Sequence, residues 1–325
     1  MISTVLSKDS IWKKFEGKWQ KEKGNPILDK GKRGDWDKTG AHGSSILKIN
    51  DLFYWYYSGW CTKPTAPGKS LEMKNVRIGL AISKDGITWT KAKKNPVLGL
   101  GEKSSWDCEY VDDPCVIKNG SIFEMWYQGG FGKSGKENNI KIDHAISEDG
   151  IHWRRYPDKP VLEADQKWEG NAVILPSVLK IKDKYYMWYT SESAKETGMV
   201  ISNDGIHWKK ESTNPVFSPT KGEWDSYLAY HCYVVYLYGY FVMVYAGRNG
   251  EFSEAPVKIG LAISKDGIEW TKYSGNPILE PEKKFNWEYG GAESIWGPHL
   301  VEVNGNLRLY YSGHDGTYFN GGVAY

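Results

Sequence analysis

Six side chains in this sequence are placed so that they could share acid–base chemistry. A carboxyl group can give up or take a proton, and surroundings that raise its pKa make it a suitable proton donor. An imidazole can do similar work because its intrinsic pKa lies near neutrality. The candidate acids are Asp113, Asp112, Glu293 and Glu109, and the candidate histidines are His42 and His231.

Five further residues could hold a ligand beside these groups. Large aromatic rings either build a core or stack on the apolar faces of sugar rings, and Trp296 and Tyr230 are the candidates for stacking. Arg248 could bind an acidic group, and Asn171 and His299 complete the predicted ligand-binding set together with the two histidines above. Each of these side chains could instead make a satisfied hydrogen bond inside a polar channel, since a desolvated polar group needs a partner.

An internal repeat must position these residues. An Asn-Pro or Lys-Pro turn recurs at residues 25, 95, 159, 214 and 276, and a Trp followed by an acid comes shortly after each turn. A run of aromatic and β-branched residues then predicts a strand. Four repeats end in a Ser-x-Asp-Gly-x-x-Trp hairpin, at 83–89, 147–153, 202–208 and 264–270. Asp-Gly favours a tight hairpin because glycine supplies the positive φ that the turn requires.

The missing fifth hairpin indicates how the chain closes. Residues 321–325 match the sequence that precedes a hairpin elsewhere, and Trp19 precedes Asn25 as the hairpin Trp precedes its turn. We therefore predict an all-β, five-bladed β-propeller of four-stranded antiparallel blades, closed by pairing of N- and C-terminal strands in the last blade. It forms a single domain over residues 1–325, with residues 1–11 as an N-terminal arm.

Superposition of the five repeats separates scaffold from candidate site. The Trp-acid pair occurs in every repeat, which predicts a structural role for Asp37, Asp107, Glu169, Asp225 and Glu288. Residues that break the repeat are candidates for function. Asp113 aligns with Gly43, Leu175, His231 and Gly297, and these positions are expected to converge where the innermost strands line a channel.

Composition limits the partners. The balance of 42 Lys+Arg against 40 Asp+Glu argues against a dedicated nucleic-acid binder. No apolar run reaches the roughly 20 residues that span a bilayer, and the absence of a signal peptide favours a cytoplasmic protein. None of the four cysteines forms a CxxC pair, so no metal or cofactor is predicted, although a divalent cation could sit where acids and histidines converge. The oligomeric state stays open.

The repeat resembles that of known enzymes. The Ser-x-Asp-Gly-x-x-Trp hairpin, the Asn-Pro-Val-Leu turn and the strand ending Met-Trp-Tyr are similar to those of the arabinanase, levansucrase and invertase group, glycoside hydrolase families 43 and 32. The resemblance implies three inner-strand carboxylates. Asp113-Pro114 matches the second of them, whereas His42-Gly43 stands where the first would lie and Trp296 stands where the third would precede Gly297-Pro298-His299.

This resemblance implies a glycosidase or related glycan-processing enzyme that acts on a furanoside or another small glycan end. Hydrolysis normally needs two carboxyl groups about 5–10 Å apart. Asp113 or Asp112 would supply one, and Glu293 or, second, Glu109 the other. The alternatives are a non-catalytic sugar-binding propeller and a sialidase, whose Asp-box the hairpin resembles at one residue shorter. A protein-interaction platform would instead show an apolar rim patch.

Overall fold

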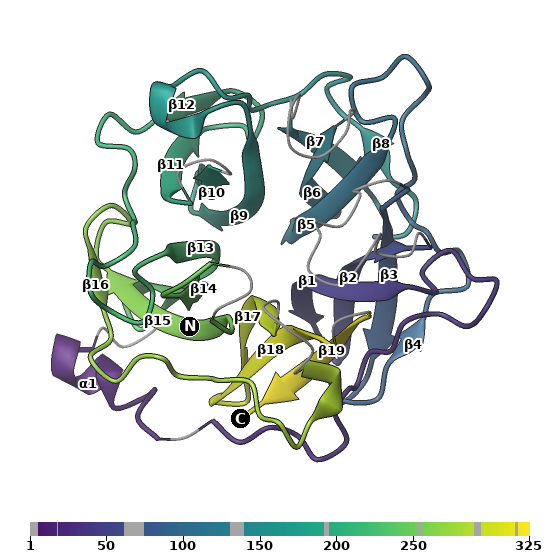
Figure 1. The fold of residues 1–325 in the computed structure, drawn as a ribbon. Coiled ribbons are helices and arrows are strands. Elements are labelled where there is room, and N and C mark those ends of the chain that lie inside the picture. The colour runs from purple at the N-terminus through teal and green to yellow at the C-terminus, as the bar shows by residue number, and fades with distance from the viewer. Residues whose placement is uncertain are drawn as a thin grey trace.

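The computed structural model describes residues 6–17, 19–61, 75–130, 140–191, 195–251, 255–288, 294–315 and 318–325. Strands dominate these ranges (Figure 1). Helix is confined in them to α1 (Lys8–Trp12) and the short 3-10 turns η1 (Lys167–Glu169) and η2 (Asn286–Glu288). Ser7 caps α1, and Ile11 is buried in the core, so this part of the predicted arm is a docked helix. No helix in the described ranges is long and apolar enough to cross a membrane.

Three sheets have four antiparallel strands each, in chain order from the centre outward. Their strands are β5 (Tyr110–Asn119), β6 (Ile122–Gly130), β7 (Lys141–Ser147) and β8 (Arg154–Arg155); β9 (Val173–Ile181), β10 (Lys184–Ser191), β11 (Thr197–Ser202) and β12 (Trp208–Lys210); and β13 (Leu228–Leu237), β14 (Tyr240–Arg248), β15 (Lys258–Ser264) and β16 (Trp270–Lys272). The predicted all-β class and four-stranded antiparallel sheets are thus confirmed.

The fourth sheet is mixed and has seven strands in the order β17-β18-β19-β1-β2-β3-β4. They are β1 (Gly40–Ile49), β2 (Leu52–Trp60), β3 (Arg77–Ser83), β4 (Thr90–Lys91), β17 (Ile295–Val303), β18 (Asn306–His314) and β19 (Phe319–Ala324). A single parallel pair, Gly40 with Phe319, joins the two halves. The N-terminal segment lies beside β19, because Lys21 forms an antiparallel bridge with Ala324.

One strand from each repeat stands innermost, and these strands gather around the centre of the molecule (Figure 1). β1 contacts β5, β5 contacts β9, β9 contacts β13, β13 contacts β17, and β17 contacts β1. Large rings fill the space between adjacent sheets, and Trp55, Trp126 and Trp188 are fully buried there. Burial of such rings is the main source of stability in this core.

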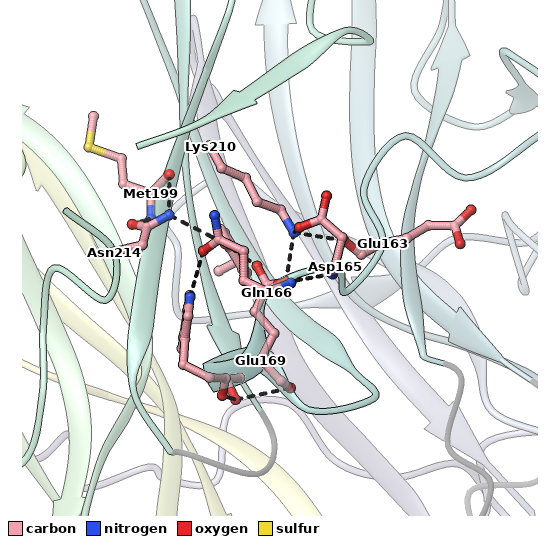
Figure 2. A network of polar contacts seen from close by, with 10 residues as sticks. Glu163, Asp165, Gln166, Glu169, Met199, Lys210 and Asn214 are labelled. Atoms are coloured by element: carbon pink, nitrogen blue, oxygen red, sulfur yellow. Dashed lines mark hydrogen bonds and ion pairs between the residues drawn. The ribbon is translucent and has the colours of Figure 1, made fainter. Parts of the chain in front are cut away.

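The acids of the repeated Trp-acid pairs are all buried. Figure 2 shows one example, in which Lys210 Nζ lies 2.7 Å from Glu169 Oε2 and 2.6 Å from Asp165 Oδ1. The Tyr189 hydroxyl donates to the other Glu169 oxygen at 2.5 Å. The corresponding acid–cation pairs are Asp37–Lys91, Asp107–Arg155, Asp225–Lys272 and Glu288–Lys21. A cation paired with each buried acid supports the scaffold role predicted for these residues.

Candidate functional site

A β-bulge interrupts every innermost strand at the superposed position. The strand register shifts between Gly43 and Ser45 in β1, and at the matching place in β5, β9, β13 and β17. φ is +44° at Asp113, +57° at Leu175, +50° at His231 and +53° at Gly297. Positive φ is uncommon in residues other than glycine. Bulges re-aim side chains next to active sites, so the sequence superposition identified a real structural position.

The bulges bring Asp113, His42 and His231 together from three strands. Asp113 Oδ1 lies 3.3 Å from His42 Nδ1 and 3.8 Å from His231 Nε2. The Ser44 hydroxyl donates to the same oxygen at 3.1 Å. Gly297 permits this approach, since a Cβ there would lie 2.9 Å from His42 Nε2. Ligand atoms of the two histidines and Asp113 all lie within 4.8 Å of one another, so these described residues could hold a metal ion.

Side chains of other strands, two of them from a neighbouring sheet, hold the bulge backbone in place. The Asp113 amide donates to Ser58 Oγ at 3.0 Å, and the Gly43 amide donates to Ser312 Oγ at 2.9 Å. Gln128 links two sheets, because its Oε1 accepts the Leu175 amide at 2.8 Å. The sequence analysis missed these residues. The signal was available, since the second strand varies at this position as Ser58, Gln128, Thr190, Ala246 and Ser312.

The two adjacent carboxyl groups differ in their surroundings. Burial, and then the charge of Asp113, raises the pKa of Asp112 to about 7. Burial also opposes ionisation of Asp113, but the hydrogen bond with His42 and the charges of both imidazoles outweigh it and lower its pKa. Burial lowers the pKa of His231 to about 4. The centre therefore combines an acid that retains its proton with an ionised carboxylate and a neutral imidazole.

Aromatic rings and a second histidine layer surround this group. The ring centroids of Tyr230 and Trp296 lie 5.2 Å apart, and those of His231 and Trp296 lie 6.3 Å apart. His299 stacks on Tyr233 with a centroid distance of 3.6 Å and is buried. It is two residues along β17 from Gly297. Its burial suits a supporting position better than direct contact with a ligand.

The remaining predicted site residues lie at strand ends. Arg248 ends β14, is buried, and has its guanidinium 5.3 Å from the centre of the Tyr227 ring. Glu109 is half-buried just before β5, and Asn171 is exposed just before β9. Glu293 lies outside the described residues. The predicted pairing of Glu293 with Asp113 therefore stays a prediction.

Carboxyl groups, imidazoles and aromatic rings gathered at the inner bulges have the composition of a small-molecule site, with a few polar groups among aromatic rings. The sequence profile of the beta-1,4-mannooligosaccharide phosphorylase family, glycoside hydrolase family 130, matches residues 68–227. An uncharacterised protein of Mycobacterium tuberculosis (strain CDC 1551 / Oshkosh) is 30% identical over 225 residues, covering 68% of this chain and 72% of that protein. The chain belongs to glycoside hydrolase family 130.

Other relatives extend over most of the chain. A 1,2-beta-oligomannan phosphorylase of Thermoanaerobacter sp. (strain X514) is 26% identical over 313 residues, covering 89% of this chain and 92% of that protein. A glycosyl hydrolase from Bacteroides ovatus shares the fold, with a TM-score of 0.73 at 18% identity and coverage of 99% and 96% of the two chains. A thermostable family-43 glycoside hydrolase also shares it, with a TM-score of 0.64 at 19% identity and coverage of 92% and 91%.

These findings refine the expectations from the sequence. The carbohydrate-active class is confirmed, and a family-43 enzyme does share the fold. The family shown is family 130, whereas membership of families 43 or 32 is not supported. Family 130 processes glycosyl bonds, and the family description names a phosphorylase, so hydrolysis is not the only reaction to consider.

Proposed function

We propose that this protein cleaves β-mannosidic bonds in short mannooligosaccharides by transfer to phosphate, with the adjacent Asp112 and Asp113 together supplying the proton. The family description and two relatives of Thermoanaerobacter sp. are named as phosphorylases of β-linked mannosides. The observation that carries the proposal is the convergence of Asp113 with His42 and His231 at the bulges. A β-mannoside takes precedence over the furanoside expected from the sequence because of those relatives.

The number of acids favours phosphate over water as the attacking group. Hydrolysis uses a second carboxylate to activate water or to attack the sugar itself. In the described inner strands, the acids at the level of the bulges are Asp112 and Asp113, which are adjacent on β5. Phosphate is already an anion and needs no base. One positioned carboxylic acid therefore suffices for the reaction.

The reaction balances with these parts. The proton held by Asp112 passes by way of the Asp113 carboxylate to the glycosidic oxygen while a phosphate oxygen bonds to the anomeric carbon and the carbon–oxygen bond to the leaving sugar breaks. The products are a sugar 1-phosphate and a glycan shortened by one residue. Asp112, whose pKa burial raises to about 7, is the neighbouring store of a proton. A single displacement inverts the anomeric configuration.

We assign binding roles to the residues around Asp113. Trp296 and Tyr230 would stack on the mannosyl ring. His42 and His231 would bind a sugar hydroxyl or phosphate, while Asn171 and Arg248 would contact more distant groups. His299 would support His231 from below. Glu293 and Glu109 are the candidates for a second acid in the hydrolytic alternative.

We interpret the sheets as five blades of one domain. The cyclic contacts from β1 to β17 and back support a closed ring. In the fifth blade β17, β18 and β19 would be completed by the N-terminal segment, which bridges Ala324 through Lys21. The Lys21–Glu288 ion pair then stands where the other blades pair their own outer-strand cation with an acid.

Product analysis tests the function. Purified protein would be incubated with β-1,2- and β-1,4-mannobiose with and without phosphate, and with an aryl arabinofuranoside. We expect mannose 1-phosphate from a mannobiose, only when phosphate is present. Mannose release that is independent of phosphate would show a hydrolase with a second acid. Saturable glycan binding without any turnover would show the non-catalytic alternative instead.

A further inference from the structure

The convergence of His42, Asp113 and His231 has a second chemical consequence. Two imidazole nitrogens face one carboxylate oxygen, and the three side chains are only 12%, 9% and 12% exposed. Their ligand atoms lie within 4.8 Å of one another. Each residue comes from a different inner strand, β1, β5 or β13, so the backbone of three sheets fixes the spacing.

One of the distances between these ligand atoms matches a small metal ion closely. Zinc binds imidazole nitrogen and carboxylate oxygen at about 2.0–2.2 Å, which places neighbouring ligands of a tetrahedral site about 3.4 Å apart. His42 Nδ1 and Asp113 Oδ1 are 3.3 Å apart. His231 Nε2 is 3.8 Å from the same oxygen, and all three ligand atoms lie within 4.8 Å of one another, so the ligands would have to move inward to complete the three-ligand set.

The type of ligand selects the type of ion. Two imidazoles and a carboxylate suit zinc, iron, cobalt or nickel, whereas calcium and magnesium prefer oxygen ligands. Three protein ligands leave at least one coordination position for water or a ligand hydroxyl. The Ser44 hydroxyl also bonds the ligating Asp113 oxygen, at 3.1 Å, and would orient the carboxylate from outside the first coordination sphere.

We propose that His42, Asp113 and His231 form a binding site for one divalent transition-metal ion of the zinc or cobalt type. The ion would take the carboxylate that the reaction proposed above uses, so it would act as a reversible inhibitor of glycan cleavage. This second statement rests on the proposed function, whereas metal binding itself does not.

Cobalt provides the test because its visible absorption reports the coordination number without any glycan. The metal-free protein would be titrated with Co²⁺, and separately with Mg²⁺ and Ca²⁺. We expect one Co²⁺ per chain, with the intense bands of a four- or five-coordinate site, and no competition from Mg²⁺ or Ca²⁺. Loss of an outer-shell partner alone weakens a site about 10–100-fold, so we expect His42→Ala and His231→Ala each to weaken binding by at least ~100-fold.

Matched variants make the result decisive. His207→Ala removes an exposed hairpin histidine and is expected to leave Co²⁺ binding unchanged. His42→Gln and His231→Gln keep side-chain volume if an alanine variant fails to fold. Absence of Co²⁺ binding to the wild type, or binding that both histidine variants retain, would overturn the proposal. If the protein cleaved no mannobiose under any condition, the proposed function would be rejected. The Co²⁺ absorption would still decide whether the metal site exists.

Discussion

The molecule contains two groups of buried carboxylates with different roles, an outer group of five and a central pair. The outer five, Asp37, Asp107, Glu169, Asp225 and Glu288, each face a lysine or arginine. The central pair, Asp112 and Asp113, faces imidazoles and hydroxyls instead. A lysine or arginine keeps its charge at neutral pH and neutralises its acid permanently, whereas an imidazole can lose its charge. The outer acids are therefore fixed scaffold, and the central pair stays able to exchange protons.

The largest expected effect is on the central pair. Asp113→Asn removes the carboxylate through which the proposed proton passes while its size is kept, and general acid catalysis contributes about 10²–10⁴-fold. We expect phosphorolysis of mannobiose to fall by about 10³-fold, measured as the initial rate of mannose 1-phosphate formation. Thermal unfolding should change little.

Asp183→Asn is the matched control because Asp183 is an exposed residue in the β9–β10 hairpin. It should retain wild-type activity. An Asp113→Asn protein as active as this control would remove Asp113 from the mechanism.

For an outer acid we expect the opposite pattern, a loss of stability with normal activity. Glu169→Gln leaves the Lys210 ammonium beside a neutral amide, and breaking one partner of a buried ion pair costs about 3–5 kcal/mol. We expect the free energy of unfolding in urea to fall by that amount, with normal activity in the folded fraction. Adding Lys210→Met should recover part of the loss, since it removes the ammonium that the single variant leaves beside a neutral amide. Unchanged stability in the single variant would contradict the scaffold interpretation.

The repeat explains how much of this division could be predicted. The sequence could predict the sheets, the scaffold acids and the aligned position that Asp113 and His231 share, because the turns, Trp-acid pairs and hairpins align across the repeats. The sequence could not predict the distances between side chains at different aligned positions, because these distances depend on bulge conformations such as the φ of +50° at His231. Gln128 and Ser58 vary between the repeats, but their roles could not be predicted, since they bond backbone amides of a neighbouring sheet and the sequence does not identify those acceptor–donor pairs.

The sheet of strands β5 to β8 contains another departure from the repeat, which the alignment of the five repeats did not identify. Gly79 lies opposite Tyr57, where a Cβ would come within 2.5 Å of the ring, yet Asp143 lies opposite Tyr127 at the matching position. The Tyr127 hydroxyl donates to Asp143 Oδ2 at 3.1 Å. Elsewhere a turn asparagine contacts this tyrosine, as Asn95 contacts Tyr57 at 3.1 Å. Asp143 therefore takes over a structural hydrogen bond.

This residue makes stability depend on pH. Burial raises the pKa of Asp143 from 3.8 to about 7, so the folded protein favours the protonated form. The stabilisation that protonated Asp143 gives the folded state is complete below pH 4 and is lost as pH rises through 7. The free energy lost has an upper bound of about 4 kcal/mol for a pKa shift of about three units. Asp143→Asn keeps a neutral side chain. We expect urea unfolding to show the variant more stable than wild type at pH 8 and similar below pH 4; an equal difference under both conditions would contradict this.

The smallest effect tests whether a cross-sheet contact positions the central pair. Gln128→Ala leaves the buried Leu175 amide without its acceptor and frees Asp112 Oδ2, which the Gln128 amide contacts at 3.4 Å. The unsatisfied donor should cost about 1–3 kcal/mol of stability, and the loosened carboxyl should lower kcat on the order of tenfold with little change in KM. Ser177→Ala frees the Val234 amide in the same way, one layer below the bulges. It should cost similar stability and leave kcat unchanged, because Ser177 bonds the Val234 amide and not Asp112. An equal loss of kcat in both variants would mean that Gln128 acts through stability alone.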